Sequence, residues 1–478
     1  MKLNKHIFYF IICMLLAVVA NLTLFYGPIG ISYSILLVFF YSVFFYQHKS
    51  YPFSQKRISG LIFFSIMALA LMYFIFSNPV FNIINYALLP LLVYVHTNLL
   101  TSPIDLHWHK PTFYLYMKSK TKKFFSASNT IMTVTTKKLR RNVGDSTYGN
   151  AKKIGIGLIF AAPLLFIVIN LLFLADAQFA NLLLSIPELL LQMNTSFFWD
   201  LIRILLLFFV FFCFFKVIGK RTVIMEYERI NEEKKNWDTV VVSTVLITLN
   251  LIYLLFTIVQ FQYFFSGGST GTLTYAEYAR RGFFELMTVT IINYVTLATT
   301  LRFSKKGPAS FVKIQLTLLI LFSSIMLTSA FMRLMMYEQA FGYTYQRIFA
   351  HAFMVYLIVI FAFTLVKVWA YRLSLARFYI LFTLLFYLGL NVINIDSIIV
   401  EKNIERYEAT GKIDIEYLGS LSYSAVPALV ELYDSEPENK ELERVLEEKQ
   451  ANLADDRWQS FNLSRENAKR ALKNTFTK

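Results

Sequence analysis

The amino-acid sequence is divided into apolar blocks of about twenty residues, which short polar stretches separate. A helix of that length crosses the roughly 30 Å hydrocarbon core of a bilayer. A membrane β-barrel would instead show alternating segments of about ten residues. Hydrophobic residues make up 56% of the 478 residues and charged residues only 16%, which is unlike a soluble domain. The sequence therefore predicts an all-α, polytopic integral membrane protein.

A window of about nineteen residues finds about eleven transmembrane helices. The shortest gap, between the first two, is marked only by the turn residues Gly27, Pro28 and Gly30. The first block also resembles a signal peptide, but its apolar stretch is long and its cleavage site is poor, so we predict an anchor. The predicted spans are residues 7–26, 28–46, 57–76, 81–100, 154–175, 200–219, 239–264, 279–301, 313–333, 347–367 and 375–395.

Basic residues are distributed unequally between alternate segments. The N-terminus and every second loop after it carry 29 Lys and Arg residues, whereas the other set of loops carries five. Because Lys and Arg are retained on the cytoplasmic side, this bias places the N-terminus in the cytoplasm. With eleven spans the C-terminus then lies outside. We predict a multi-pass protein of a bacterial cytoplasmic membrane.

The predicted organisation has four parts. Residues 1–100 form four N-terminal spans, 101–153 a basic cytoplasmic loop, 154–395 a seven-helix transmembrane core, and 396–478 a small helical extracytoplasmic tail. In the tail, the last span is expected to continue to about Glu408 and to end at Gly411. Three amphipathic helices should follow, at residues 418–433, 438–453 and 464–473.

The net charge of +16 does not indicate nucleic-acid binding, because the basic residues lie in short loops between apolar blocks. The loop 101–153 contains eight lysines and arginines between 118 and 141, interleaved with aromatic residues. This composition predicts a segment at the membrane surface that attracts anionic lipid. The lipid bilayer is thus the expected partner, with a protein partner as a further hypothesis and no nucleic acid.

Known catalytic and metal-binding motifs do not occur. The chain contains no phosphate-binding P-loop, no nucleophile elbow and no zinc-protease motif, and its two cysteines lie inside predicted spans. His107 and His109 flank Trp108 without accompanying carboxylates, so we interpret them as residues of a solvated loop. We predict neither a metal nor a cofactor.

Charged residues avoid the middle of the predicted spans: of the 13 acidic residues before the tail, seven lie in cytoplasmic loops and six lie near the outer surface. This absence of charge from the middle of the membrane argues against a proton- or sodium-coupled pump. Thr274 and Glu277 form a capping box, and Glu285 follows on the same helix face as Arg281. The candidate site for a ligand or partner comprises Arg280, Arg281, Glu285, Arg333, Glu338, Arg347, His351 and Asp396. A shared pocket predicts the Glu285 carboxylate within about 4–6 Å of Arg333 or Arg347. Interface anchors and local ion pairs are the alternative.

Two functions are consistent with these residues. One is non-enzymatic recognition of a ligand or protein partner at the outer face, for transport, sensing or as an accessory subunit. The other is an integral-membrane enzyme acting on a lipid-linked or cell-envelope substrate, with His351 and either Glu285 or Glu338 as acid–base groups. The enzyme requires His351 within hydrogen-bonding reach of a carboxylate.

Three stretches resemble a bacterial membrane-protein family, the domain of unknown function 4173. They are TYAEYARRGFFEL at 274–286, YEQAFGYTYQRIFAHAF at 337–353, and NVINIDSIIVEKNIERYEATGKIDIEYLGSLSYSAVPAL at 391–429. The resemblance covers roughly residues 150–429 and includes Asn394-Ile395-Asp396 at the start of the tail. It implies a bacterial membrane protein without an established reaction.

Overall fold

The computed structural model describes residues 5–104, 106–143, 195–219, 237–265, 283–303, 308–370, 372–453 and 457–476. All regular secondary structure in these ranges is helical, so the predicted all-α class is confirmed. Within them, nine helices are long and apolar enough to cross a membrane, and a tenth, at Ile31–Gln47, is apolar but shorter.

Ten of the predicted spans coincide with helices of the structure. The remaining span, at 154–175, lies outside the described residues. The ten helices are α1 (Lys5–Leu24), α2 (Ile31–Gln47), α3 (Lys56–Ile75), α4 (Pro79–Leu100), α8 (Thr195–Ile218), α9 (Thr239–Phe265), α11 (Phe283–Arg302), α12 (Ser310–Phe341), α13 (Tyr345–Trp369) and α14 (Leu375–Val392).

The predicted end of the ninth span, at residue 333, is wrong. Helix α12 continues to Phe341 and has 32 residues, which corresponds to about 48 Å at 1.5 Å per residue. Hydropathy falls after residue 333 because Arg333 and Glu338 are charged, but both side chains are buried and the helix continues through them.

The chain divides into two compact units. One comprises Met1–Ser59 and Tyr94–Ile224, and the other comprises Gly60–Val93 and Met225–Lys478, so the division falls within α3 and α4. In the first unit α1 packs on α2 and α8. Helix α5 (Pro111–Val143) lies inside the segment predicted as a basic loop and packs on α8.

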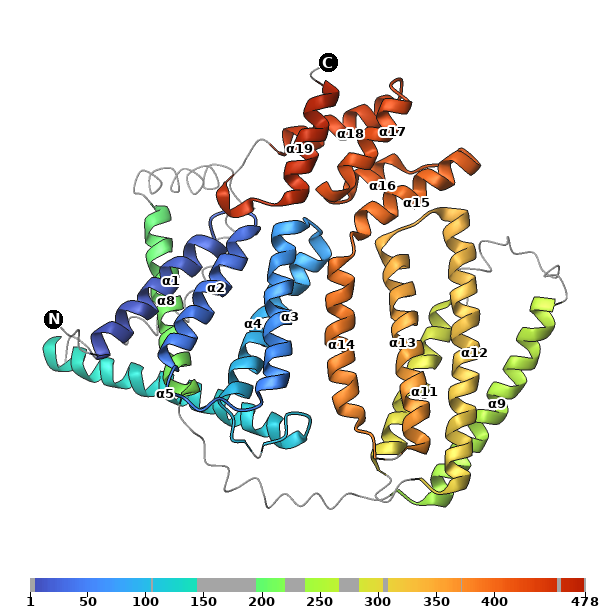
Figure 1. The fold of residues 1–478 in the computed structure, drawn as a ribbon, viewed down its shortest axis with the longest axis horizontal. Helices are drawn as coiled ribbons and strands as arrows, with labels where there is room; N and C mark the ends of the chain where they lie inside the picture. The colour runs from blue at the N-terminus through green and yellow to red at the C-terminus, as the bar shows by residue number, and fades with distance from the viewer. Residues whose placement is uncertain are drawn as a thin grey trace, which may run out of the picture. The chain divides into compact units, whose positions relative to one another are not determined.

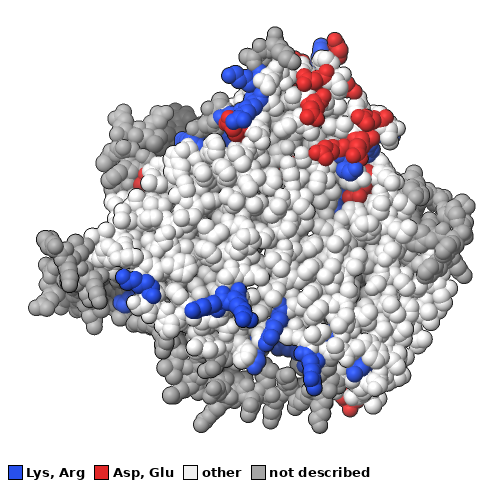
Figure 2. Space-filling view, viewed as in Figure 1, with Lys and Arg blue, Asp and Glu red and all other residues white. Residues whose placement is uncertain are grey.

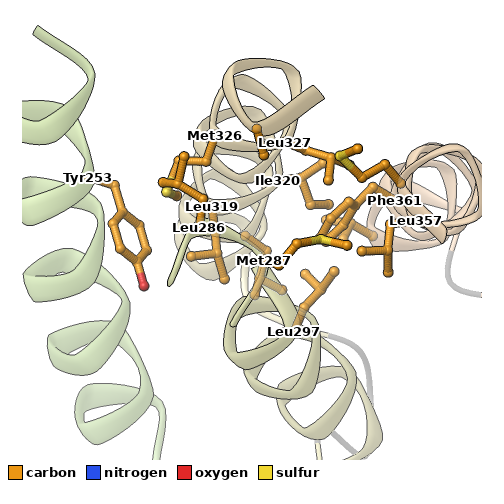
Figure 3. Packing of buried hydrophobic residues seen from close by; sticks show 14 of the residues in the cluster. Tyr253, Leu286, Met287, Leu297, Leu319, Ile320, Met326, Leu327, Leu357 and Phe361 are labelled. Carbon is orange, nitrogen blue, oxygen red and sulfur yellow. The ribbon is translucent and has the colours of Figure 1, made fainter. Parts of the chain in front are cut away.

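In the second unit α12 packs on α9, α11 and α13. Figure 3 shows how apolar side chains of these helices interdigitate, with Met287 and Leu297 from α11, Ile320 from α12 and Phe361 from α13. Neutral polar groups also join the helices: the Tyr253 hydroxyl donates to Asn293 Oδ1 at 2.7 Å. Such hydrogen bonds between apolar helices stabilise their association.

The last part of the second unit is a helical tail. It consists of α15 (Ile395–Thr410), α16 (Ile415–Ser420), η1 (Tyr423–Ala425), α17 (Val426–Ser435), α18 (Lys440–Ala451), η2 (Trp458–Ser460) and α19 (Leu463–Phe476). These helices gather at one end of α12, α13 and α14 (Figure 1) around a core of their own. Figure 2 shows Asp and Glu side chains over this tail, above a broad face that carries little charge.

The last span does not continue into the tail, so that prediction is wrong. Helix α14 ends at Val392, and α15 begins as a new helix whose cap is Asn394, with its side chain accepting from Ser397 N at 3.3 Å. The predicted end at Gly411 is confirmed, since this glycine has φ +67° in the left-handed region that ends helices. The predicted helix 418–433 is two helices and a 3₁₀ turn.

Candidate functional site

The turn between α12 and α13 brings a carboxylate and an imidazole together near the tail end of the second unit. His351 Nε2 lies 2.8 Å from Glu338 Oε2. Glu338 is only 2% exposed, and the edge of the His351 ring packs on Phe331 at 4.5 Å between centroids. The two helices are antiparallel neighbours, so residues 13 apart across the turn face each other. The structure therefore pairs two of the predicted site residues.

This pair leaves two polar atoms without a hydrogen bond. Among the described residues, neither Glu338 Oε1 nor His351 Nδ1 has a partner, and both atoms are buried. A buried polar atom without a hydrogen bond costs about 1–3 kcal/mol. The second carboxylate oxygen can only accept when Glu338 is ionised, whereas Nδ1 accepts or donates according to the tautomer. Each of these two atoms therefore retains the capacity for one further hydrogen bond.

Arg333 lies on the same helix, five residues before Glu338 and about 7.5 Å away along the axis. It is 7% exposed. Buried ionisable groups in transmembrane helices are rare and mark functional sites by default. Arg333, Glu338 and His351 thus concentrate such groups within two adjoining helices.

The other predicted arginine of this hairpin has a structural role. Arg347 Nη1 donates to Phe341 O at 3.1 Å and to Gly342 O, and its guanidinium lies 4.3 Å from the centroid of the Tyr337 ring. The last carbonyls of a helix have no partner inside the helix and carry partial negative charge. Arg347 satisfies two carbonyls at the end of α12, which accounts for its position without a ligand.

A second arginine completes this cap from the tail. Arg406 of α15 donates from Nε to Gln339 O at 3.0 Å and from Nη2 to Ala340 O at 2.8 Å. Asn403 on the same helix accepts from Tyr343 N at 3.0 Å and donates to Tyr343 O at 2.9 Å. Helix α15 is thereby held against the α12–α13 turn.

Asp396 is the centre of a buried hydrogen-bond network that joins the tail to the membrane helices. Its side chain is 1% exposed and accepts from Asn78 Nδ2 at 2.8 Å, from Ser422 N at 3.0 Å and from the Tyr345 hydroxyl. Asn78 precedes α4, Tyr345 begins α13, and Ser422 precedes η1. Three donors on separate elements thus converge on one carboxylate, which also lies in the first turn of α15, where a negative charge is favoured.

Lys449 of α18 adds a positive charge to this region. Its Nζ donates to Leu421 O and lies 5.4 Å from the centroid of the Tyr423 ring. Burial lowers the pKa of Lys449, and the negative charge of Asp396 opposes that shift. Lys449 therefore places a positive charge in the part of the tail that holds Asp396.

Glu285, among the described residues, is not joined to this arrangement. Glu285 is exposed in the first turn of α11 and forms no ion pair in the described part of the chain. Arg280 and Arg281 lie outside the described residues. The expected approach of Glu285 to Arg333 or Arg347 is not among the contacts of the structure and stays a prediction.

Sequence reasoning missed several members of the Asp396 network. Asn78 precedes Pro79, and an Asn-Pro pair before an apolar run is a signal for a turn or a helix start. The side-chain oxygen Oδ1 of Asn78 caps α4 by accepting from Phe81 N at 3.1 Å. Lys449 lies on a strongly charged helix, and no sequence signal distinguishes it from its exposed neighbours.

The fold and this arrangement define a polytopic α-helical membrane protein with a helical tail attached through buried polar contacts. The chain belongs to the family described as domain of unknown function (DUF4153), whose model matches residues 63–432. The family number 4173 inferred from the sequence motifs is therefore corrected to 4153. The match includes Asn78, Glu338, His351 and Asp396 and ends before α18. No curated protein and no solved structure matches the chain.

Proposed function

We propose that this protein recognises a polar ligand or a protein partner at the Glu338–His351 pair, beneath the tail, without catalysing a reaction. The observation that supports this function is that the pair retains two buried polar atoms without a hydrogen bond, Glu338 Oε1 and His351 Nδ1. Because an ionised carboxylate only accepts hydrogen bonds, the ligand must offer a hydroxyl or an ammonium group. Transport, sensing and an accessory role all use such a site.

The site faces the extracytoplasmic side in this proposal. Lys313 near the start of α12, Lys367 near the end of α13 and Arg372 before α14 lie at the helix ends away from the tail. Cytoplasmic ends are rich in Lys and Arg, so this distribution supports a tail outside the cell and a ligand that arrives from outside.

The basic segment 101–153 is proposed to bind anionic lipid on the cytoplasmic side. Lys118 and Lys122 are exposed on α5, whereas Phe113 and Tyr116 are buried. Lys120 is not part of this surface, because it is buried and its Nζ donates to two carbonyls at the end of α8. An amphipathic basic helix of this kind is typical of a membrane surface.

Ligand recognition is tested by thermal unfolding of the purified protein in lipid nanodiscs, with ethanolamine, glucosamine and glycerol 3-phosphate as probes. At least one probe should raise the Tm of the natural protein, since binding to the folded state stabilises it. The shift should disappear in Glu338→Gln. The matched control is Glu405→Gln, which changes an exposed glutamate paired with Lys402 and should keep the shift. An absent shift, or one that Glu338→Gln retains, contradicts the proposal.

The second candidate function is acid–base catalysis on a lipid-linked or envelope substrate. The observation that favours it is the 2.8 Å hydrogen bond between His351 and Glu338, since a carboxylate of this kind orients an imidazole as a general base. Incubation of nanodiscs with a bacterial lipid extract, followed by thin-layer chromatography, distinguishes the two. A product formed by the natural protein and lost in His351→Gln would establish the enzyme and refute pure recognition.

A further inference from the structure

The segment 457–464, which joins α18 to α19, has an inverted pattern of burial. Its large apolar side chains are exposed: Trp458 by 53%, Phe461 by 45% and Leu463 by 38%. The polar side chains between them are buried, with Gln459 at 6% and Asn462 at 4% exposure. A segment surrounded by water would have the opposite pattern, because exposing large apolar groups to water is unfavourable.

The same segment is fixed to the end of a membrane-spanning helix. Asn462 Nδ2 donates to Tyr73 O and to Phe76 O, both at 2.7 Å, and Ser464 Oγ donates to Ile75 O at 2.8 Å. Tyr73 and Ile75 lie in the last turn of α3 and Phe76 follows it, at the end of a helix where backbone carbonyls lack partners within the helix. Asn462 also caps the beginning of α19, where its Oδ1 accepts from Ser464 N at 2.9 Å. One asparagine therefore connects the two helix ends.

This attachment determines the depth of the exposed aromatic residues. Helix α3 is a candidate span of 20 residues, about 30 Å long, so its ends lie at the two boundaries of the hydrocarbon core. The segment 457–464 must then lie at one boundary. The ring centroid of Phe461 is 5.8 Å from that of Phe74, a residue of the last turn of α3. Trp and other aromatic residues are enriched at this level of a membrane.

Basic side chains accompany the aromatic ones. Arg457 precedes Trp458, and α19 carries Lys469 and Lys473 four residues apart on one side of the helix. Arg465, one turn earlier, packs on Tyr423, with its guanidinium 4.9 Å from the ring centroid. Anionic phospholipid headgroups attract basic residues near a membrane surface. Apolar side chains at the boundary and cations along the adjoining helix are the two features of an interfacial anchor.

We propose that residues 457–464 form an interfacial anchor that inserts Trp458, Phe461 and Leu463 among the phospholipids of the leaflet in which α3 ends. The ligand is the bilayer itself, with its acyl chains contacting the three apolar groups and anionic headgroups facing the basic side of α19. The anchor holds the tail against the membrane at a point distinct from the Asp396 network. It does not depend on the function proposed for Glu338 and His351.

The experiment uses fluorescence quenching of the full-length protein in nanodiscs of phosphatidylcholine and phosphatidylglycerol. Cys13 and Cys213, both buried, are replaced by serine, and a bimane probe is attached at Trp458→Cys. The control probe is at Glu441→Cys, an exposed position on α18. A lipid carrying a nitroxide near its headgroup should quench the probe at 458 several-fold more than the control, and aqueous iodide should do the reverse.

With the probe at position 458, two outcomes overturn the proposal. Equal quenching of both probes by iodide would place residue 458 in water. Protection of position 458 from both quenchers would mean that protein, from this chain or from a partner, covers it. Because a probe at position 458 removes the tryptophan, a second labelled variant, Leu463→Cys, is measured in a protein that retains Trp458. It must also be quenched by the lipid nitroxide, and quenching of Leu463→Cys by iodide alone refutes the anchor.

Discussion

Replacing Asp396 with asparagine tests the attachment of the tail, because the side chain keeps its shape and loses one acceptor. An ionised aspartate accepts from all three donors, Asn78 Nδ2, Tyr345 OH and Ser422 N. An asparagine can direct its oxygen toward Tyr345 and Ser422, but its NH₂ group then faces the NH₂ group of Asn78. If the Asn78 amide is flipped instead, its Oδ1 no longer accepts from Phe81 N, and the unpaired donor then lies at the start of α4.

The expected cost follows from this count of donors and acceptors. One buried donor is left without a partner in either arrangement, at about 1–3 kcal/mol. The two remaining hydrogen bonds also change from charged to neutral acceptors, which weakens each of them. Together these changes destabilise the docked tail by about 2–4 kcal/mol. Asp396→Ala, which removes the acceptor that the three donors share, should cost about 3–5 kcal/mol.

Hydrogen exchange of backbone amides in nanodiscs measures this local opening. Because 1.4 kcal/mol corresponds to a factor of ten, amides of η1 and α17 should exchange about 30- to 700-fold faster in Asp396→Asn. The matched control is Asp414→Asn at the exposed cap of α16, where the side chain accepts from Tyr417 N at 2.9 Å. Asparagine caps as well as aspartate, so the control should change stability by less than about 0.5 kcal/mol. Unchanged exchange in Asp396→Asn, or equal opening in the control, refutes the reasoning.

Three further substitutions have expected outcomes that thermal unfolding in nanodiscs can check. Gly342→Ala should lower the free energy of unfolding by at least about 3 kcal/mol, because φ is +83° and the new Cβ would lie 2.4 Å from an asparagine oxygen. Gly411→Ala, at a glycine with φ +67° and open space around it, should cost only about 1–2 kcal/mol, and equal losses would contradict this. Arg406→Ala should cost about 1–3 kcal/mol through the lost cap of α12, and Lys402→Ala, an exposed pair, under about 1 kcal/mol. Burial lowers the pKa of Lys120 from 10.5 to about 8, so the unfolded chain binds more protons between these values and stability should rise with pH from about 8 to about 10.5. This rise should be smaller in Lys120→Met than in the natural protein, and an equal rise in both refutes the assignment.

The spans and the tail faces could be predicted from the sequence because both depend on local periodicity. Block length alone located ten helices of the structure. In the tail, the apolar positions repeat at helical spacing, and Val426, Leu429, Leu442 and Leu446 of that repeat are buried, whereas Tyr433 is only partly buried. A hydrophobic face must be covered by something, so the pattern predicts burial even when the covering element is unknown.

The contacts of the site could not be predicted, because they join residues that are distant in the sequence. Asn78 and Asp396 are 318 positions apart, and nothing local to either residue indicates the other. Helix ends were also predicted at the wrong positions where charged residues were assumed to be exposed. Arg333 and Glu338 lowered the hydropathy of α12 without ending it, and the break before α15 depends on Asn394 as a cap. A polar residue within an apolar stretch can be a cap, a buried pair or a loop, and only tertiary contacts distinguish these.

The polar residues at the tail end of the second unit can be distinguished by the hydrogen bonds that each already forms. Arg347 satisfies carbonyls at the end of α12, Asn462 caps two helices, and Asp396 accepts from three donors. Their positions follow from the need to pair every buried backbone group. Within the described residues, Glu338 and His351 differ, because each uses one atom in their mutual hydrogen bond and retains a buried atom that no protein group satisfies. Hydrogen bonds within the described residues therefore do not account for these two atoms, and it is there that the proposed ligand would bind.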